Sequence, residues 1–453
     1  MKFELIMSKP IVERAPSFDY SEVDLEKIKK YLKDYDATDE KGRYLHWNVL
    51  KWRLPKAEAK DIWMAIKLKR SLGMKITELK DDKDNYFSYS IPHSMEAKLH
   101  QIIEIAGGNV AAIADSSASN GIQQRYLVSS LIMEEAITSA QLEGAATTRE
   151  VAKKMLEEER EPHNEDERMV LNNYFLLKHA EKVAKEDLTV DLILDFHNIA
   201  TQFTTENNVV PGEFREDNDI FVEDGRGEIA HQPPCFKLLQ ERLQALCLFV
   251  NGDHSGKAGE VFIPPVIKAI IIHFMLGYEH PFRDGNGRTA RALFYWYMLK
   301  NDYELFRYIS ISKLLKDNAK GYGLSYMYTE KDQNDMTYFI DFQLDMILAA
   351  FDELQTYLET KTEEFQQVLQ ILDNSKFSNT LNFVQKDILK KATKEPGRVF
   401  TVKEISSSYS IADNTSRNYL KELVSLKLLL AAKDARTFIY ISPADLMERL
   451  TRS

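Results

Sequence analysis

The segment from His280 to Arg291, HPFRDGNGRTAR, concentrates residues that could handle a phosphate group. Gly285 and Gly287 allow the backbone to turn so that successive N–H groups converge and form an anion-binding nest. The helix expected after the loop adds the positive end of its dipole at the same point. Arg288 and Arg291 are three residues apart and share one face of that helix. Together these features predict a phosphate cradle with two guanidinium groups.

Two further side chains of this segment could take part in catalysis. Asp284 places a carboxylate beside the cradle, and proteins usually hold Mg²⁺ with a carboxylate next to bound phosphates. His280, at the start of the loop, can accept a proton from an attacking hydroxyl near neutral pH. Phe282 lies between them and is expected to point inward and anchor the loop. A base, a metal ligand and a charge-stabilising nest suit phosphoryl or nucleotidyl transfer.

Two helices must position this loop. The apolar stretch from Pro265 to Glu279 predicts a buried helix before it, and the pattern from Arg288 to Lys300 predicts another after it. The stretch 261–278 contains Lys268 and His273, which favours a buried helix over a membrane span. We therefore expect a mainly α fold. Helical spacing also marks residues 124–142, 189–203, 235–250 and 338–371.

A β-hairpin is expected between two of these helices. Asp224-Gly225 separates two short apolar arms, residues 219–222 and 227–231, and such a dipeptide favours a tight turn between strands.

The segment from His280 to Arg291 resembles the motif of the Fic family, His-x-Phe-x-Asp/Glu-Gly-Asn-Gly-Arg-x-x-Arg, and a chance match of this length is rare. Related Doc kinases carry lysine in place of Gly287, so a Doc-like kinase is disfavoured. The resemblance extends over the helical core, residues 120–360. The matching fixed positions are His280, Phe282, Asp284, Gly285, Asn286, Gly287, Arg288 and Arg291.

The resemblance implies a Fic-type helical bundle with a hairpin flap, and an enzyme that transfers AMP from ATP to a Ser, Thr or Tyr hydroxyl of a protein and releases pyrophosphate. His280 would then be the base, Asp284 would hold Mg²⁺, and the nest around Asn286 would bind the α- and β-phosphates. Arg288 and Arg291 would hold the outer phosphates.

The resemblance also implies a function for the hairpin, as a flap that pairs with the target peptide by strand addition. Ile220, Phe221 and Val222 would form its edge facing the nucleotide and the peptide. Tyr322 lies where the family often has a tyrosine near the adenine. A purely structural hairpin is the alternative.

Residues 139–144, SAQLEG, resemble the family's inhibitory pattern, Ser/Thr-x-x-x-Glu-Gly/Asn. Ser139 and Glu143 are four residues apart and share a helix face, and Gly144 is expected to end that helix. A carboxylate at the helix tip could pair with Arg291 and exclude productive ATP. The alternative is that Ser139 and Glu143 are ordinary solvent-facing residues.

The C-terminal residues, 381–453, have the helix, helix, helix, hairpin order of a winged helix-turn-helix module. Thr401 and Glu404 form a capping box at one helix start. Glu422 and Asp434 interrupt the basic character, so nucleic-acid contact and protein docking both remain open. The polar residues expected to decorate the second helix and the wing tip are Asn414, Ser416, Arg417, Asn418, Lys421, Lys433 and Arg436.

We expect four parts: an accessory region 1–115, a catalytic domain 116–360 with the inhibitory helix at about 124–144, a connecting helix 361–380, and the winged helix 381–453. The net charge of -11 argues against a surface that binds nucleic acid throughout. Two cysteines and the lack of a signal-like N-terminus fit a cytoplasmic protein without a membrane anchor. A homodimer is compatible with the sequence.

Two other functions share these features. With Glu143 orienting a water, the same site could remove AMP from a protein. Alternatively, the helical body could sense a nucleotide while the winged helix binds DNA. An intact His280 and Asp284 favour chemistry over sensing alone.

Overall fold

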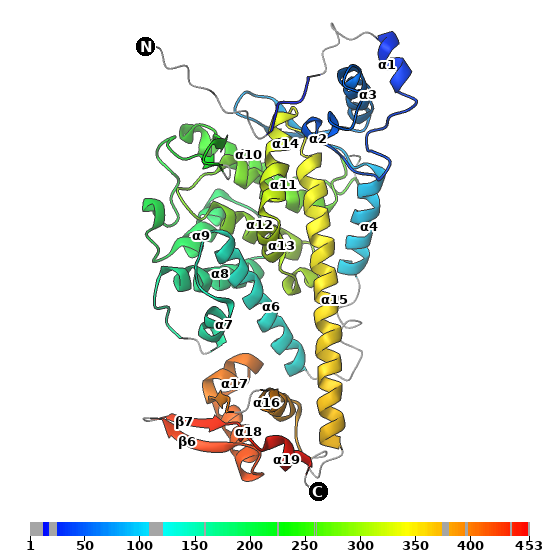
Figure 1. Ribbon diagram of the computed structural model, residues 1–453. Coiled ribbons are helices and arrows are strands. Elements are labelled where there is room, and N and C mark those ends of the chain that lie inside the picture. The colour runs from blue at the N-terminus through cyan, green and yellow to red at the C-terminus, as the bar shows by residue number, and fades with distance from the viewer. Residues whose placement is uncertain are drawn as a thin grey trace, which may run out of the picture. The chain divides into compact units, whose positions relative to one another are not determined.

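The computed structural model is mostly helical, as expected, and most of its helices carry labels in Figure 1. It divides into two compact units: Met1–Ala106, Phe175–Tyr303 and Ile311–Ala349 form unit 1, and Gly107–Tyr174, Glu304–Ser310 and Ala350–Ser453 form unit 2. The expected inhibitory helix groups with the C-terminal residues in unit 2, because it contacts helices there. The structure describes residues 12–17, 25–107, 121–157, 160–223, 226–257, 259, 261–373, 380–394, 397–434 and 437–451.

Two buried helices form the centre of unit 1. α11 (Pro265–Glu279) begins with proline at its first position, where the missing N–H costs no hydrogen bond. α12 (Asn286–Lys300) packs against it, and nearly every residue of both helices is buried. A helix that is apolar all round must be covered on all sides. The cover includes α9 (Val190–Thr201) against α12 and α10 (Leu239–Asn251) against α11.

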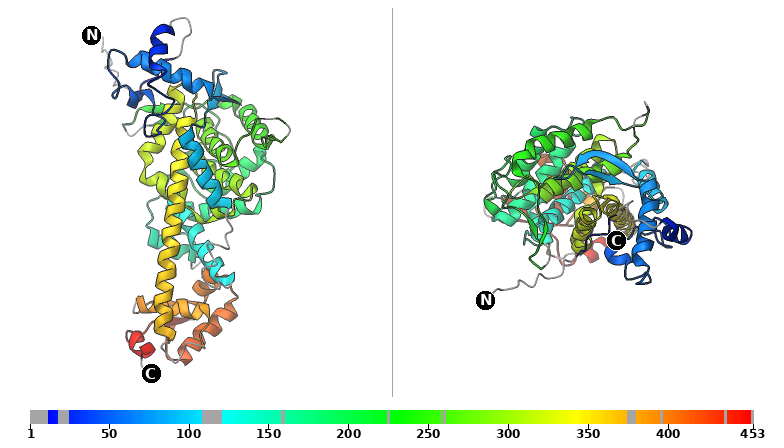
Figure 2. Two further views of the ribbon diagram at one scale, coloured as in Figure 1. Left: turned by 90° about the vertical axis from the view of Figure 1, so that its right-hand side faces the viewer. Right: turned by 90° about the horizontal axis from the view of Figure 1, so that it is seen from above.

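The N-terminal part of unit 1 packs around Trp47 and Trp63. β2 pairs antiparallel with β1. α4 runs alongside α15 (Figure 2), where Lys98 pairs with Asp341 at 2.7 Å. These elements are α1 (Leu25–Tyr31), α2 (Trp47–Leu50), α3 (Ala59–Leu72), β1 (Lys75–Lys80), β2 (Tyr86–Tyr89) and α4 (His93–Gly107).

After α12 the chain continues through helices. The expected helical signal at 338–371 is one continuous helix, α15 (Thr337–Asp373), which also covers most of the expected connecting helix. Residues 374–379 lie outside the described residues. The remaining elements of this stretch are η3 (Glu304–Tyr308), α13 (Ile311–Asp317) and α14 (Ala319–Lys331).

In unit 2, α6 (Gly121–Leu142) and α7 (Arg149–Glu157) share a small apolar cluster with α8 (Glu165–Lys182). Met133, Ile137 and Ala140 contribute from the last turns of α6. This cluster fixes the end of the expected inhibitory helix within its own unit.

The C-terminal residues form a separate apolar core with the expected order of elements. Thr401 and Glu404 make both hydrogen bonds of the predicted capping box. A third strand, β5, joins the expected hairpin in the order β5-β7-β6. The elements are α16 (Phe383–Lys394), β5 (Val399–Phe400), α17 (Val402–Tyr409), α18 (Asp413–Ser425), β6 (Leu430–Asp434), β7 (Thr437–Ile441) and α19 (Leu446–Thr451).

One prediction for α18 is wrong. Ser416 is fully buried, and its hydroxyl donates to the carbonyl of Ala412, so it cannot decorate the surface. Asn414, Arg417 and Lys421 are exposed, as expected. The wing-tip residue Arg436 lies outside the described residues.

No helix in the described ranges combines the length and apolar character that crossing a membrane requires.

Candidate active site

The predicted loop joins the end of α11 to the start of α12. His280 caps α11 in the left-handed conformation, with φ 43°, and its N–H donates to Leu276 at 3.0 Å. Gly285 precedes the first residue of α12 and is also left-handed, with φ 78°. The loop is therefore short, and the positive end of the α12 dipole lies close to His280 in the chain.

The ring of His280 has a defined orientation. Its Nδ1 lies 3.3 Å from the carbonyl oxygen of Gly277. A carbonyl can only accept, so Nδ1 carries the proton and donates it. The lone pair is then on Nε2, which is the arrangement a general base needs.

Asn286 closes the loop with its side chain. Its Oδ1 accepts from the N–H of Phe282 at 2.9 Å, and its Nδ2 donates to the carbonyl of Phe282 at 2.8 Å. The side chain is buried, so both amide atoms are used within the protein. Asn286 therefore fixes the loop, and only its backbone N–H remains as part of the predicted nest.

His197, on α9, packs against the loop. Its ring stacks on Phe282 with centroids 3.7 Å apart and planes 2° from parallel. Nδ1 accepts from the N–H of Gly212 at 3.0 Å, so Nε2 carries the proton and donates to the carbonyl of Asp284 at 3.0 Å. Burial lowers the pKa of His197 to about 4, which keeps the ring neutral.

Gly285 cannot be replaced without strain. Besides its left-handed backbone, a Cβ at this position would lie 2.7 Å from Cγ2 of Thr201 and 3.3 Å from the His197 ring. α9 therefore approaches the loop closely only because Gly285 has no side chain.

Arg215 also holds the loop, through hydrogen bonds to its backbone. Its Nε donates to the carbonyl of His280 at 2.9 Å, and its backbone N–H donates to the carbonyl of Pro281 at 2.9 Å. The side chain is 2% exposed and also donates to the carbonyls of Asp217 and Pro234. It thereby links the loop to both ends of the hairpin segment.

Asp284 and Arg288 interact directly. One guanidinium nitrogen of Arg288 bonds Oδ2 of Asp284, and another donates to the carbonyl of Ala200 at 2.8 Å. The Arg288 side chain is fully buried, whereas that of Asp284 is 16% exposed. Nε of Arg288 is buried and has no partner among the described residues. The site therefore contains one oriented carboxylate and one unsatisfied cationic donor.

Residues 187–298 match the model of the Fic/DOC family. The match includes α9, Arg215, the hairpin, both central helices and the whole loop. The chain carries a Fic domain.

Curated relatives agree with this assignment at modest identity. "Protein adenylyltransferase Fic" of Drosophila melanogaster is 32% identical over 125 residues, which are 28% of this chain and 23% of that protein. The protein of the same name from Drosophila persimilis is 27% identical over 201 residues, 43% of this chain and 36% of that protein. The chain thus spans only about a quarter to a third of the length of these relatives.

Two solved structures are similar at lower identity. A Fic family protein from Desulfovibrio desulfuricans G20 has a TM-score of 0.49 and 17% identity, covering 79% of this chain and 98% of that one. Fic-1 from C. elegans has a TM-score of 0.48 and 15% identity, covering 70% of this chain and 82% of that one. The family assignment rests on the match over residues 187–298.

The Fic domain contains the expected hairpin, but its strands are shorter than predicted. β3 (Val222–Glu223) pairs antiparallel with β4 (Ile229–His231) through an irregular register. Ile220 and Phe221 precede β3, and Phe221 is 42% exposed. The tip, Asp224-Gly225, lies outside the described residues. Of the predicted edge, only Val222 lies in a strand.

A buried histidine of β4 anchors the hairpin to α11. Nε2 of His231 donates to the carbonyl of Tyr278 at 2.7 Å, and Nδ1 lies 2.9 Å from the Glu330 carboxylate. Both contacts are acceptors, so the imidazolium form suits the site. Burial alone would lower the pKa of His231, but the Glu330 carboxylate outweighs it and raises the pKa.

Tyr322, predicted near the adenine, belongs to an aromatic group on α14. Its hydroxyl lies 2.8 Å from Nε2 of His273, a buried residue of α11. Its ring centroid lies 5.3 Å from that of Tyr326. The adenine contact stays a prediction.

Ser139 and Glu143 lie in unit 2. α6 ends at Leu142, and Gly144 is left-handed with φ 103°, so the predicted helix stop is confirmed. Ser139 is buried and Glu143 half-buried, so neither is an ordinary solvent-facing residue. Their inhibitory function stays a prediction.

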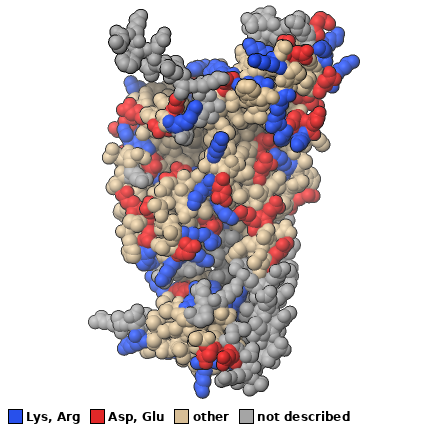
Figure 3. Space-filling view, in the orientation of Figure 1, with Lys and Arg blue, Asp and Glu red and all other residues tan. Residues whose placement is uncertain are grey.

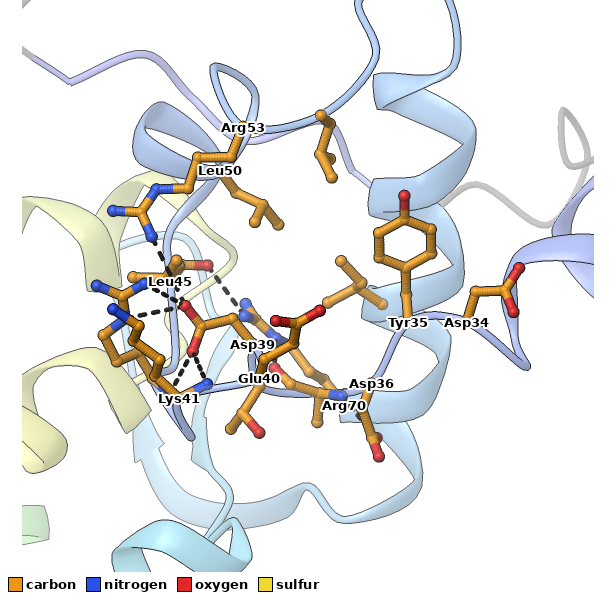
Figure 4. Close-up of a pocket in the computed structure, with 15 residues that line it drawn as sticks. Asp34, Tyr35, Asp36, Asp39, Glu40, Lys41, Leu45, Leu50, Arg53 and Arg70 are labelled. Atoms are coloured by element: carbon orange, nitrogen blue, oxygen red, sulfur yellow. Dashed lines mark hydrogen bonds and ion pairs between the residues drawn. The ribbon is translucent and has the colours of Figure 1, made fainter.

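A cavity of about 580 Å³ lies elsewhere in unit 1 (Figure 4). It is lined by residues between Asp34 and Arg70, and no residue of the loop contributes. Asp39 at its centre already accepts from the N–H groups of Lys41 and Arg43 and from the Arg43 side chain. This cavity is therefore separate from the loop.

Sequence reasoning missed His197 and Arg215 as supports of the site. Both contact the loop across long separations, 87 and 65 residues. A histidine within an apolar helical pattern was the one signal for His197.

Proposed function

We propose that the chain is a self-inhibited protein adenylyltransferase, which transfers AMP from ATP to a Ser, Thr or Tyr hydroxyl of a protein. The observation that carries this is the tautomer of His280, whose lone-pair nitrogen belongs to a loop that leads directly into a helix N-terminus. The names of the Drosophila relatives support the same activity.

In the proposed reaction, Nε2 of His280 removes the proton of the acceptor hydroxyl. The acceptor oxygen then bonds to the α-phosphorus, and the bond from that phosphorus to the bridging oxygen breaks to release pyrophosphate. The backbone N–H groups at the start of α12, with the dipole of that helix, stabilise the charge that develops on the phosphates.

The donor set at Asp284 fits Mg²⁺. Oδ2 bonds Arg288, and Oδ1 has no hydrogen bond among the described residues. Mg²⁺ is usually held by one or two carboxylates together with substrate phosphates. When bound, the ion would neutralise charge on the phosphates.

Arg288 and Arg291 would have different functions. Arg288 orients Asp284, and its unsatisfied Nε is a donor that a phosphate oxygen would complete. Arg291, one turn further along α12, would hold an outer phosphate. Glu143 at the end of α6 would compete for Arg291 and keep the enzyme idle.

Mass spectrometry of the intact protein after incubation with ATP and Mg²⁺ tests this proposal. We expect slow self-modification by AMP in wild type, a clear increase in Glu143→Gly, and none in Glu143→Gly/His280→Ala. Modification that survives in the double variant would remove His280 as the base. Equal modification of wild type and Glu143→Gly would remove the inhibition.

Pre-modified protein tests the reverse chemistry. Incubating AMP-modified protein with wild type and Mg²⁺ should leave the AMP in place. Release of AMP that depends on Glu143 would favour removal over transfer.

A further inference from the structure

The hairpin segment of the Fic domain is strongly acidic. Residues 213–228 contain seven acidic residues and two arginines. On the face of the molecule in Figure 3, by contrast, acidic and basic side chains are interspersed over most of the described surface. The segment therefore has a local excess of negative charge.

Arg215 does not neutralise the exposed carboxylates of this segment. Arg215 is buried and donates to backbone carbonyls and to Asn218, and Asp217 pairs with Arg283 of the loop. Five carboxylates of the segment, including that of Glu228, are exposed, and four of them form no ion pair with any described residue. These four are Glu213, Glu216, Asp219 and Glu223.

These carboxylates are on residues close in sequence to the groups that hold the loop of His280. Arg215 bonds the carbonyls of His280 and Pro281, so Glu213 and Glu216 flank a residue in direct contact with the loop. Glu223 lies on β3, the strand of the proposed flap. We therefore expect a segment that brings a hydroxyl to His280 to pass near these carboxylates.

We infer that the acceptor hydroxyl lies in a basic segment, with Lys or Arg residues flanking the modified Ser, Thr or Tyr. This rests on the proposed function and adds the class of substrate. The carboxylates would pair with the flanking cations, while the exposed Phe221 and Ile229 contact apolar atoms of their long stems. Each exposed pair contributes little, but four together shift selectivity by about tenfold.

Three synthetic peptides of equal length test this inference. Each carries one serine, flanked by lysine, glutamine or glutamate, and is incubated with full-length Glu143→Gly protein, ATP and Mg²⁺. We expect the lysine peptide to be modified about tenfold faster than the glutamate peptide at low salt. The preference should largely vanish at 1 M salt, because exposed charges are then screened. Equal rates at low salt would overturn the inference.

Two variants distinguish the effect of this segment from the effect of the overall negative charge of the protein. Glu213→Gln/Glu216→Gln/Asp219→Asn/Glu223→Gln should lose the preference. Asp34→Asn/Glu40→Gln/Glu78→Gln/Glu241→Gln changes the net charge equally on other elements and should keep it. If both variants keep the preference, the segment is not its source and the inference fails.

Peptide binding separates this inference from the proposed function. Fluorescence anisotropy of the same peptides with full-length His280→Ala needs no turnover. Tighter binding of the lysine peptide to His280→Ala, together with no transfer by Glu143→Gly to any peptide or to the chain itself, would refute the adenylyltransferase and keep the basic partner. Transfer to all peptides with equal binding would keep the enzyme and refute the basic acceptor.

Discussion

The loop between α11 and α12 and the hairpin of the Fic domain are held in opposite ways. The loop is fixed by buried groups on three sides: the Asn286 amide, the stacked His197 ring and the Arg215 guanidinium. The hairpin has two short strands with an irregular register, and His231 is its main buried anchor. Its apolar residues Phe221 and Ile229 are exposed.

The difference matches what the proposed functions of the loop and the hairpin require. A base and a phosphate nest act only at fixed geometry, since small displacements cost large factors in rate. A surface that binds a protein segment can adjust to it. We therefore expect changes in the loop to affect turnover and stability, and changes in the hairpin to affect acceptor binding.

The largest contrast is expected between two left-handed glycines. Gly285→Ala meets Thr201 at 2.7 Å, whereas Gly227→Ala in the hairpin meets nothing within 4 Å. We expect Gly285→Ala to reduce AMP transfer by about 100-fold or more and to lower the free energy of unfolding by about 1–3 kcal/mol. Gly227→Ala has only the penalty of a left-handed backbone and should lower the free energy of unfolding by about 1 kcal/mol. Denaturant unfolding and initial rates would show whether the two variants differ.

The pH response should also differ. In the loop, His197 has a folded pKa of about 4, below its unfolded value near 6.5. The unfolded state therefore gains a proton first as the pH falls. We expect the free energy of unfolding to decrease by about 3 kcal/mol between pH 6.5 and 4 because of this residue. His231 has a raised folded pKa, so its stabilisation is complete below 6.5 and is lost as the pH rises through that folded value.

Hydrogen exchange would follow both changes. Amides of residues 282–289 should exchange faster in acid, and those of 229–231 faster in base, after correction for the intrinsic rates. His231→Phe should remove only the second response. The same sign of change in both segments would contradict this assignment of the two histidines.

The smallest stability effect is expected from the exposed apolar residues of the hairpin. Phe221→Ser and Ile229→Ser should change the free energy of unfolding by about 0.5 kcal/mol or less. They should raise the KM for a protein acceptor several-fold and leave that for ATP nearly unchanged. Phe282→Ser, fully buried in the loop, is the matched control and should cost several kcal/mol. A raised KM for ATP with an unchanged acceptor KM would assign Phe221 to the nucleotide instead.

The sequence was most informative where an interaction is local. The loop packs its chemistry into twelve contiguous residues, and the C-terminal capping box needs residues three apart, so both were predicted. His197 and Arg215 act through contacts with residues far away in the chain, which no local pattern contains. Ser416 was misjudged because a polar residue on a helix was expected to face solvent, whereas it is buried and bonds its own helix.

The left-handed backbone of His280 has a consequence for the history of such proteins. Glycine or asparagine at that helix end would relieve strain of about 1 kcal/mol, yet either would remove the proposed base. Random drift toward a more stable chain therefore runs against activity at this one position. If turnover depends on His280, selection for activity and selection for stability oppose each other at this position.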